Sequence, residues 1–198
     1  KADGGVWILN PSSANTFTGS LTAGGGSLGM AADGIGSASL ISISNGAIFG
    51  YGGDLVTSKT INWANNSTAV FSGSNNITLN GTFQVASGNN DGTFSNNLDT
   101  GAVLTINNNF TNLKANNRNF FIRGYGSTVW NGSIQDAAAN TTGWDIRIHN
   151  DASFTTRVVG TTVSSMFGPT QRTPNTVFTW PARSSQFGTP GSLCATTQ

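Results

Sequence analysis

Residues 14–49 read ANTFTGSLTAGGGSLGMAADGIGSASLISISNGAIF, and this stretch decides the fold of the chain. It consists of short segments rich in β-forming residues, each closed by glycine or by Asn-Gly. Around Phe17 and Leu21, threonines lie between or beside apolar residues, close to the period of two that is typical of a half-buried strand. Asn45-Gly46 then predicts a turn, because both residues adopt positive φ at little cost. The stretch therefore predicts short strands joined by tight turns.

The same pattern continues beyond residue 60, where apolar segments alternate with clusters of asparagine. Six such clusters lie between residues 65 and 117: Asn65-Asn66, Asn75-Asn76, Asn89-Asn90, Asn96-Asn97, Asn107-Asn108-Asn109 and Asn116-Asn117. In a β-solenoid, successive coils stack about 4.8 Å apart, so corner residues repeat in register and their amides can form ladders. Asparagine also accepts the left-handed backbone conformation that a tight corner needs. We therefore predict an all-β, right-handed parallel β-solenoid (β-helix) with coils of about 20–25 residues.

The composition excludes several other classes of protein. Only 9% of the residues are charged, against about a quarter in ordinary globular domains. Glutamate is absent and Gly, Asn, Ser and Thr are abundant, so a mostly helical fold is not expected. The twelve Phe and five Trp argue against disorder. The net charge of +1 and the scattered arginines predict no nucleic-acid partner, and no apolar run is long enough for a membrane span.

The first quarter of the chain resembles a known family of repeats. The residues that carry the resemblance are Gly5 with Val6–Leu9, then ANTFTG at 14–19, GSL at 26–28, GIGSA at 34–38, and NGAI at 45–48. They are similar to the autotransporter-associated β-strand repeat of secreted bacterial passenger proteins, with Phe17 in place of the usual Tyr and Gly-Ser-Leu in place of Gly-Thr-Leu. The resemblance implies a right-handed β-solenoid on an exported or cell-surface bacterial protein, and it implies no activity.

The two ends of the chain differ from its middle. Val6–Leu9 is fully apolar and predicts a buried strand at once, with no capping helix before it, so this end is expected to continue a longer solenoid or to dock on another copy. The first five residues lack the apolar core of a signal peptide, as expected of a mature product or a fragment. Prolines punctuate the C-terminal part, so we predict a solenoid domain at 1–160 and a cap, edge strand or extended arm at 161–198.

The C-terminal part holds one good strand between prolines. Its residues, predicted as a strand that could be added to a neighbouring copy, are Thr176, Val177, Phe178, Thr179 and Trp180. Cys194 is the only cysteine, so no internal disulfide can form, although it could link two chains.

No residue pattern in the sequence points to catalysis, a cofactor or a metal. No two of the eight aspartates lie close in sequence, although stacked coils could bring Asp33, Asp54 or Asp91 together as a carboxylate pair. His149 is the only histidine, and the G-x-S-x-G setting of a nucleophilic serine is absent. Residues 89–92 resemble half of a calcium loop, which turn chemistry explains better. We therefore expect no catalytic, metal or cofactor site.

Three aromatic residues near several arginines are candidates for contact with a glycan or a partner: Tyr125, Trp130 and Trp144. Packing in the core or against an adjacent chain is the competing interpretation. The expected function is a non-enzymatic structural or adhesive rod on or outside a bacterial cell, which associates with copies of itself end to end or through the C-terminal arm and contacts cell-surface or matrix glycans. The alternatives are a glycan-binding or polysaccharide-cleaving β-helix, and a pilin-like β-sandwich subunit that exchanges antiparallel strands.

Overall fold

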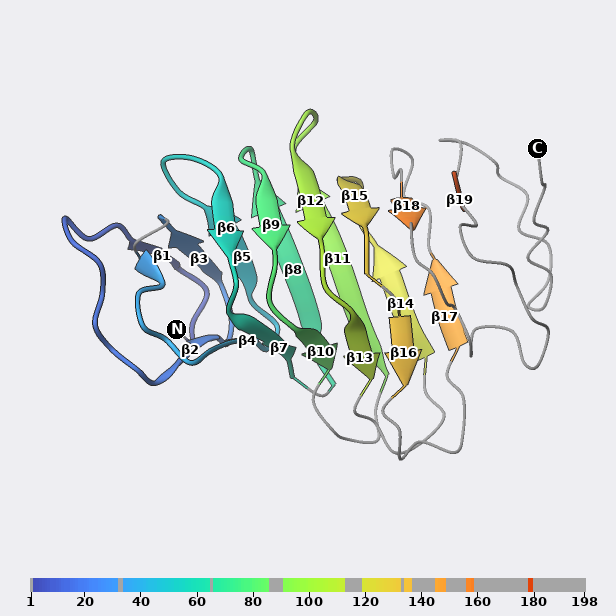
Figure 1. Ribbon diagram of the computed structural model, residues 1–198, viewed down its shortest axis with the longest axis horizontal. Helices are drawn as coiled ribbons and strands as arrows, with labels where there is room; N and C mark the ends of the chain where they lie inside the picture. Colours follow the sequence, from blue (N-terminus) through green and yellow to red (C-terminus); the bar gives the residue numbers. More distant parts are fainter. Residues whose placement is uncertain are drawn as a thin grey trace.

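The structure is a computed structural model that describes residues 2–31, 34–64, 66–85, 91–112, 119–132, 134–136, 145–148, 156–158 and 178–179. In these residues the chain is all-β and contains no α-helix, and its strands form three parallel sheets wound as a β-solenoid (Figure 1). Across this part of the chain there is no helix of the length and apolarity that crossing a membrane would require. The predicted fold class is therefore confirmed.

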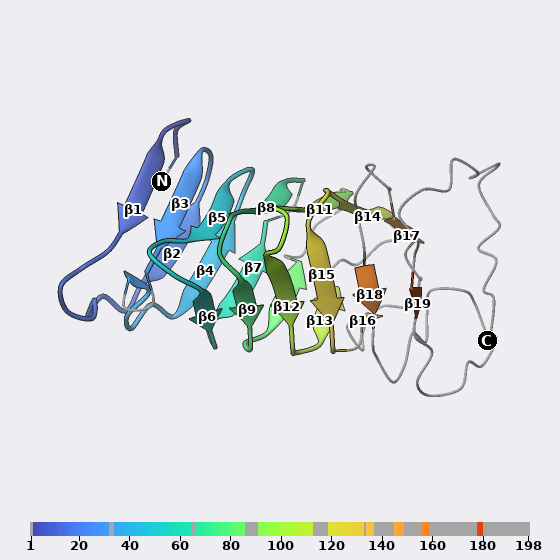
Figure 2. The ribbon, with the colours of Figure 1, turned by 90° about the horizontal axis from the view of Figure 1, so that it is seen from above.

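Sheets A and B begin in the first coil, and sheet C begins in the third. Sheet A contains, in spatial order, β1 (Val6–Leu9), β3 (Ser27–Met30), β5 (Ala47–Gly50), β8 (Thr68–Gly73), β11 (Gly92–Leu98), β14 (Asn119–Arg123) and β17 (Asp145–Ile148). Sheet B contains β2 (Ser20–Ala23), β4 (Leu40–Ile43), β7 (Thr60–Trp63), β10 (Phe83–Val85), β13 (Phe110–Asn112) and β16 (Ile134–Asp136). Sheet C contains β6 (Leu55–Thr57), β9 (Ile77–Leu79), β12 (Val103–Ile106), β15 (Ser127–Trp130), β18 (Thr156–Val158) and β19 (Phe178–Thr179). Equivalent strands of successive coils lie side by side along the long axis (Figure 2).

Strand direction separates this fold from the β-sandwich alternative. Among the described residues, every strand pair is parallel except β18 with β19. A sandwich that exchanges strands would show antiparallel ladders instead. Coil length follows from the register: Ser27 lies opposite Ala47, 20 residues later, and Gly92 lies opposite Phe120, 28 residues later. The coil that starts at Gly92 thus exceeds the predicted 20–25 residues, because it has a longer strand in sheet A and a strand in sheet C that the coil starting at Ser27 lacks.

The first two coils close without a strand in sheet C. In its place, residues 10–19 of the first coil stack on residues 31 and 34–39 of the second, with hydrogen bonds from Ala31 N to Leu9 O (3.0 Å) and from Ser37 N to Asn15 O (3.1 Å). The Asn15 side chain adds a bond from Nδ2 to Gly34 O of 2.7 Å. The ANTFTG segment therefore lies directly against the GIGSAS segment of the next coil, so the two motifs quoted from the sequence are structural neighbours.

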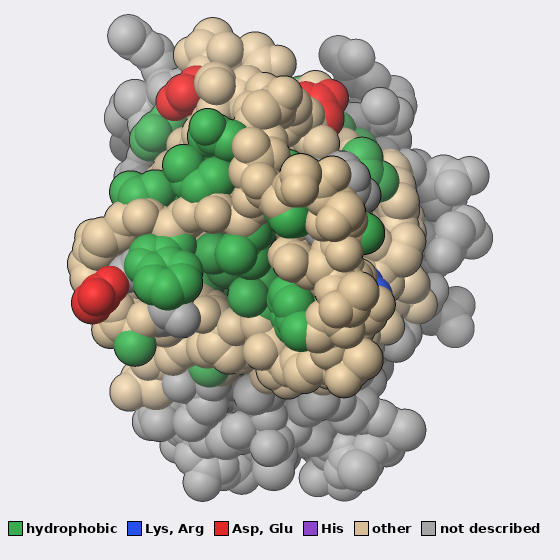
Figure 3. Space-filling view, turned by 90° about the vertical axis from the view of Figure 1, so that its left-hand side faces the viewer, with side chains coloured by type: hydrophobic (Ala, Val, Ile, Leu, Met, Phe, Trp, Pro, Cys, Tyr) green, Lys and Arg blue, Asp and Glu red, His purple; other side chains and the backbone are tan. Residues whose placement is uncertain are grey.

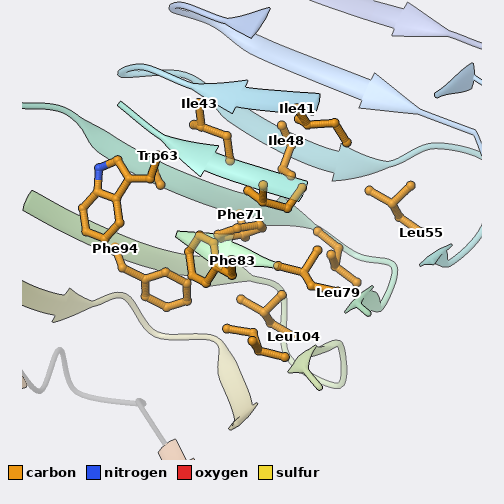
Figure 4. Packing of buried hydrophobic residues seen from close by; sticks show 14 of the residues in the cluster. Ile41, Ile43, Ile48, Leu55, Trp63, Phe71, Leu79, Phe83, Phe94 and Leu104 are labelled. Carbon is orange, nitrogen blue, oxygen red and sulfur yellow. The ribbon is translucent and has the colours of Figure 1, made fainter. Parts of the chain in front are cut away.

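The interior of the solenoid is filled by every second side chain of its strands. β4 and β7 each alternate between half-buried and buried residues, and the buried ones are Ile41, Ile43, Ile61 and Trp63. Figure 4 shows Ile41, Ile43 and Trp63 in the packed interior. This alternation arises because successive side chains of a strand point to opposite faces. Aromatic rings take over in the middle coils, where Phe83 lies within 5.2–6.1 Å, centroid to centroid, of four other rings: Phe71, Phe94, Phe110 and Trp130.

The asparagine clusters behave as predicted at some corners and not at others. Asn45 and Asn66 have φ of 58° and 54°, as expected for left-handed corner residues. Asn96-Asn97 was expected to close a strand, but β11 continues through both residues to Leu98. The pairing with β8 runs on in register, and the fully buried Asn96 side chain donates from Nδ2 to Ser127 O (2.9 Å) and Thr128 Oγ1 (2.8 Å) in the next coil. A satisfied buried amide thus replaces the predicted corner.

Candidate interaction surfaces

An asparagine ladder runs along the corner that leads from sheet C to sheet B. Asn80, Asn107 and Asn131 each follow a strand of sheet C in successive coils, and all three are exposed. Asn107 Nδ2 donates to Asn80 Oδ1 at 2.8 Å, and Asn131 Nδ2 donates to Asn107 Oδ1 at 2.7 Å. The ladder extends coil-to-coil hydrogen bonding beyond the backbone. These side chains therefore serve the stacking of coils, as their repetition in the sequence predicts.

A second polar ladder lies on the corner that leads from sheet A to sheet C. Both carboxylate oxygens of Asp54 accept hydrogen bonds from Asn76 of the next coil, one from its backbone N and one from its Nδ2, each at 2.9 Å. Asn76 Oδ1 in turn accepts from Val103 N at 2.9 Å. Asp54 is thus paired with an amide of the neighbouring coil, and its ladder is a structural feature.

The predicted convergence of aspartates does not occur in the described part of the chain. Asp91 precedes β11, on the corner that leads from sheet B to sheet A, whereas Asp54 lies on the corner between sheets A and C. Asp33 and His149 lie outside the described residues. Within the described ranges, no group of three or more His, Cys, Asp and Glu side chains is placed to hold a metal ion.

The three predicted aromatic contacts have different outcomes. Tyr125 is 48% exposed at the corner between β14 and β15. Trp130 is fully buried, because it is an inward residue of β15 and its ring lies 5.7–6.0 Å from the rings of Phe83, Phe94 and Phe110. A glycan in solution therefore cannot stack on Trp130, and that prediction is wrong. Trp144 lies outside the described residues.

Sequence reasoning missed a second exposed tyrosine that lies on the same corner of the solenoid as Tyr125. Tyr51, between β5 and β6, is 38% exposed and occupies the corner position three coils earlier in the stack. Both tyrosines are flanked by glycines, in Gly50-Tyr51-Gly52 and Gly124-Tyr125-Gly126. Comparison of these two Gly-Tyr-Gly tripeptides is the sequence signal that could have linked them.

The C-terminal strand predicted for exchange pairs within its own chain. Phe178–Thr179 forms β19, which runs antiparallel to β18 with Val158 opposite Phe178 and Arg157 opposite Thr179. It is the last strand of sheet C. Thr176, Val177 and Trp180 lie outside the described residues, as does Cys194. Exchange of this strand between copies stays a prediction.

The N-terminal end of the solenoid exposes apolar side chains. Val6, Trp7 and Ile8 of β1 are 63%, 59% and 46% exposed, and Figure 3, which looks onto this end, shows hydrophobic side chains across its centre with acidic ones at the rim. β1 forms as predicted, but its side chains are not buried. Trp7 lies opposite the buried Leu28, so it continues the inward-facing column of sheet A, with no further strand of that sheet beyond it among the described residues. Three of the large hydrophobic side chains that are exposed in the described part of the chain thus lie together on β1.

No family model, curated protein or solved structure matches the chain. Function is therefore inferred from the fold and from three surfaces: the corner ladders, the tyrosine corner and the apolar end. The ladder side chains bond to each other along the axis. The other two surfaces present side chains outward and are suited to binding.

Proposed function

We propose that this chain is a non-enzymatic structural or adhesive segment that works as a stiff rod on or outside a bacterial cell. The observation that carries the proposal is the continuity of bonding from coil to coil. Parallel sheets A and B tie successive described coils together from the first coil, sheet C joins them from the third coil onward, and two side-chain ladders add bonds at the corners. A body bonded along three lines resists bending in every direction.

The packed interior supports the same reading. Trp63 from β7, Phe83 from β10, Phe110 from β13 and Trp130 from β15 belong to four successive coils, yet their rings form one connected cluster through contacts of 5.2–6.4 Å between centroids. Ring contacts of this kind add about 0.5–1.5 kcal/mol per pair beyond the burial of apolar area. Bending the rod would separate these rings on one side, so the cluster opposes deformation.

The proposed location rests on composition and on resemblance. A chain poor in charged residues and rich in Asn, Gly and Thr, together with the similarity of residues 5–48 to passenger-domain repeats, supports an extracellular bacterial rod. In solenoids each coil is stabilised by its neighbours, so a longer stack of similar coils is a simple way to build a longer rod.

A second candidate function, glycan binding, is favoured by the tyrosine corner. Exposed aromatic rings stack on sugar rings, and Tyr51 and Tyr125 present two such rings on one corner. If they bind a glycan, a Tyr51→Ala, Tyr125→Ala double variant loses retention on immobilised polysaccharide. Phe17→Ala, which removes a ring that is also 38% exposed but lies on the first coil, serves as the control and keeps it.

The structural proposal is tested by imaging and by assay of the same preparation. Negative-stain electron microscopy of the purified chain is expected to show straight particles with one long axis, and incubation with a panel of polysaccharides is expected to release no reducing ends. Round particles would contradict the proposal. Cleavage of any polysaccharide would also contradict it if that cleavage stops when an aspartate is mutated.

A further inference from the structure

The chain contains three Asn-Gly pairs, and all of them lie at corners of the solenoid: Asn45-Gly46, Asn80-Gly81 and Asn131-Gly132. In each pair the asparagine is exposed and the glycine is buried. A Cβ built on Gly81 would lie 2.2 Å from Lys59 O, and one built on Gly132 would lie 2.1 Å from Asn108 O. A side chain at either position would collide with the backbone of the preceding coil, so the packing of the coils requires glycine after both asparagines.

An asparagine followed by glycine carries two groups that can react with each other. The glycine nitrogen attacks the side-chain Cγ of the asparagine, because glycine has no Cβ to obstruct the approach. An N–Cγ bond forms, the Cγ–Nδ2 bond breaks, and Nδ2 leaves as ammonia with the proton that the glycine nitrogen gives up. Water then opens the cyclic imide at one of its two carbonyls, which leaves aspartate or isoaspartate.

The glycine nitrogens of the three pairs are available for this reaction. Among the described residues, the backbone N–H groups of Gly46, Gly81 and Gly132 have no hydrogen-bond partner. No hydrogen bond therefore has to be broken at the attacking nitrogen. What differs between the pairs is how the asparagine side chain is held.

Asn107 holds the side chains of two of these asparagines. Its Nδ2 donates to Asn80 Oδ1 at 2.8 Å, and its Oδ1 accepts from Asn131 Nδ2, the atom that would leave as ammonia, at 2.7 Å. Cyclisation turns the amide group toward the main chain, so either side chain has to release Asn107 first. Asn45 lies on another corner, between β4 and β5, where its Oδ1 accepts from Thr68 N at 2.9 Å.

We propose that Asn80 and Asn131 are sites of spontaneous deamidation and that Asn107 restrains both of them. The asparagine ladder then has a chemical role in addition to its part in the stacking of coils, because it protects corners at which glycine cannot be replaced. This inference goes beyond the proposed rod and does not depend on it.

Deamidation would weaken the contact between coils. Isoaspartate adds one atom to the main chain, at a corner where the following glycine is packed against the preceding coil. Aspartate keeps the main chain but replaces the donor Nδ2 with an acceptor, so a carboxylate at position 131 would face Asn107 Oδ1. A restraint on the reaction therefore also preserves the stability of the stack.

The test is the rate of deamidation at each Asn-Gly pair, measured on the folded full chain after storage in mildly alkaline buffer, by digestion and mass spectrometry. In Asn107→Ala, the rates at Asn80 and at Asn131 are each expected to rise by up to about fivefold, which corresponds to the loss of one hydrogen bond of about 1 kcal/mol. Asn45 is the internal reference, and its rate is expected to stay the same.

Two further variants separate the ladder from a general loosening of the solenoid. Asn62→Ala removes another amide contact between coils, from Gln84 Nε2 to Asn62 Oδ1 at 3.3 Å, and is expected to change none of the three rates. Asn107→Leu keeps the size of the side chain but lacks both amide groups. It decides the matter if circular dichroism shows that Asn107→Ala melts much earlier than the parent.

Three results would overturn the inference. Equal acceleration at Asn45 would show that the Asn107 variants loosen the whole solenoid. Unchanged rates at Asn80 and Asn131 in both variants would show that the ladder does not restrain them. If neither residue converts in the folded variants although both convert in urea, the backbone of the corner prevents the reaction, and Asn107 does not.

Discussion

Two buried tryptophans show how differently one residue type is accommodated in this core. Trp63 Nε1 donates a hydrogen bond to Ser67 O at 2.8 Å, whereas Trp130 Nε1 is buried and has no hydrogen-bond partner. A buried polar group without a partner costs about 1–3 kcal/mol. The sequence gives no sign of this difference, because both tryptophans are the last residue of a four-residue strand.

This contrast predicts the outcome of two identical substitutions. Trp63→Phe removes the Nε1–H donor to Ser67 O, which keeps only the longer bond from Thr93 N (3.3 Å), whereas Trp130→Phe removes a donor that has no partner. Trp63→Phe is therefore expected to lower the free energy of unfolding by about 1–3 kcal/mol more than Trp130→Phe. The two changes delete the same atoms, so the loss of volume largely cancels between them. Urea unfolding followed by tryptophan fluorescence and circular dichroism measures the difference. Equal costs, or a larger cost at Trp130, would show that the hydrogen bond is not what distinguishes them.

The asparagine ladder makes a second prediction at this scale. Asn107 both donates and accepts within the ladder, whereas Asn80 Oδ1 only accepts from Asn107. Asn107→Ala is therefore expected to destabilise the solenoid about twice as much as Asn80→Ala, with each lost bond worth up to about 1 kcal/mol at an exposed site. The midpoint of thermal unfolding is the measurement. If the two variants melt at the same temperature as the parent, the ladder does not contribute to stability.

At the scale of single elements, the sequence predicts well where strands and corners lie, but it predicts poorly which of their side chains are buried and which are exposed. The alternation of apolar and polar residues around Ile41 and Ile43 is a local signal, and so is the turn at Asn45-Gly46. Both can be predicted directly from the order of the residues. Whether Asn96 ends a strand or enters the core depends on Ser127 and Thr128, 31 and 32 residues later. The burial of Trp130 and the exposure of Trp7 likewise depend on which coils lie on either side. Local patterns cannot carry that information.

The packing of the first two coils can be tested through one glycine. Gly36 has a φ of +53°, and a Cβ built there would lie 1.9 Å from Asn15 O, within the contact between the first and second coils. Gly52 has a φ of +75° but no atom within 4 Å of its built Cβ. Gly36→Ala is therefore expected to lower the free energy of unfolding more than Gly52→Ala does. For Gly52→Ala, only backbone strain of about 1–3 kcal/mol applies.

Hydrogen exchange resolves this effect by position. In Gly36→Ala, amides of the first two coils are expected to exchange faster while those of β8 to β12 keep their protection, because solenoid coils interact mainly with their neighbours. Equal exchange in the two glycine variants would mean that the segments at 10–19 and 34–39 are not packed as described.

At the scale of the whole molecule, one physical idea links the fold to the proposed function. Coils that bond to their neighbours through parallel sheets and two side-chain ladders suit the stiff rod that we propose. The side-chain hydrogen bonds between its coils run along the axis, and most of its exposed apolar residues lie on the first coil. The sequence predicts the stacking through repeated asparagine corners, but it does not show that sheet C begins only at β6, since that depends on how residues 10–19 and 34–39 close the first two coils.

X-ray diffraction from aligned, concentrated protein tests the central claim most directly. Strands stacked coil upon coil predict a strong reflection near 4.8 Å along the long axis of the particles, because that is the spacing between paired strands. A reflection at this spacing perpendicular to the long axis, or no orientation of the particles at all, would contradict a rod built by stacking coils.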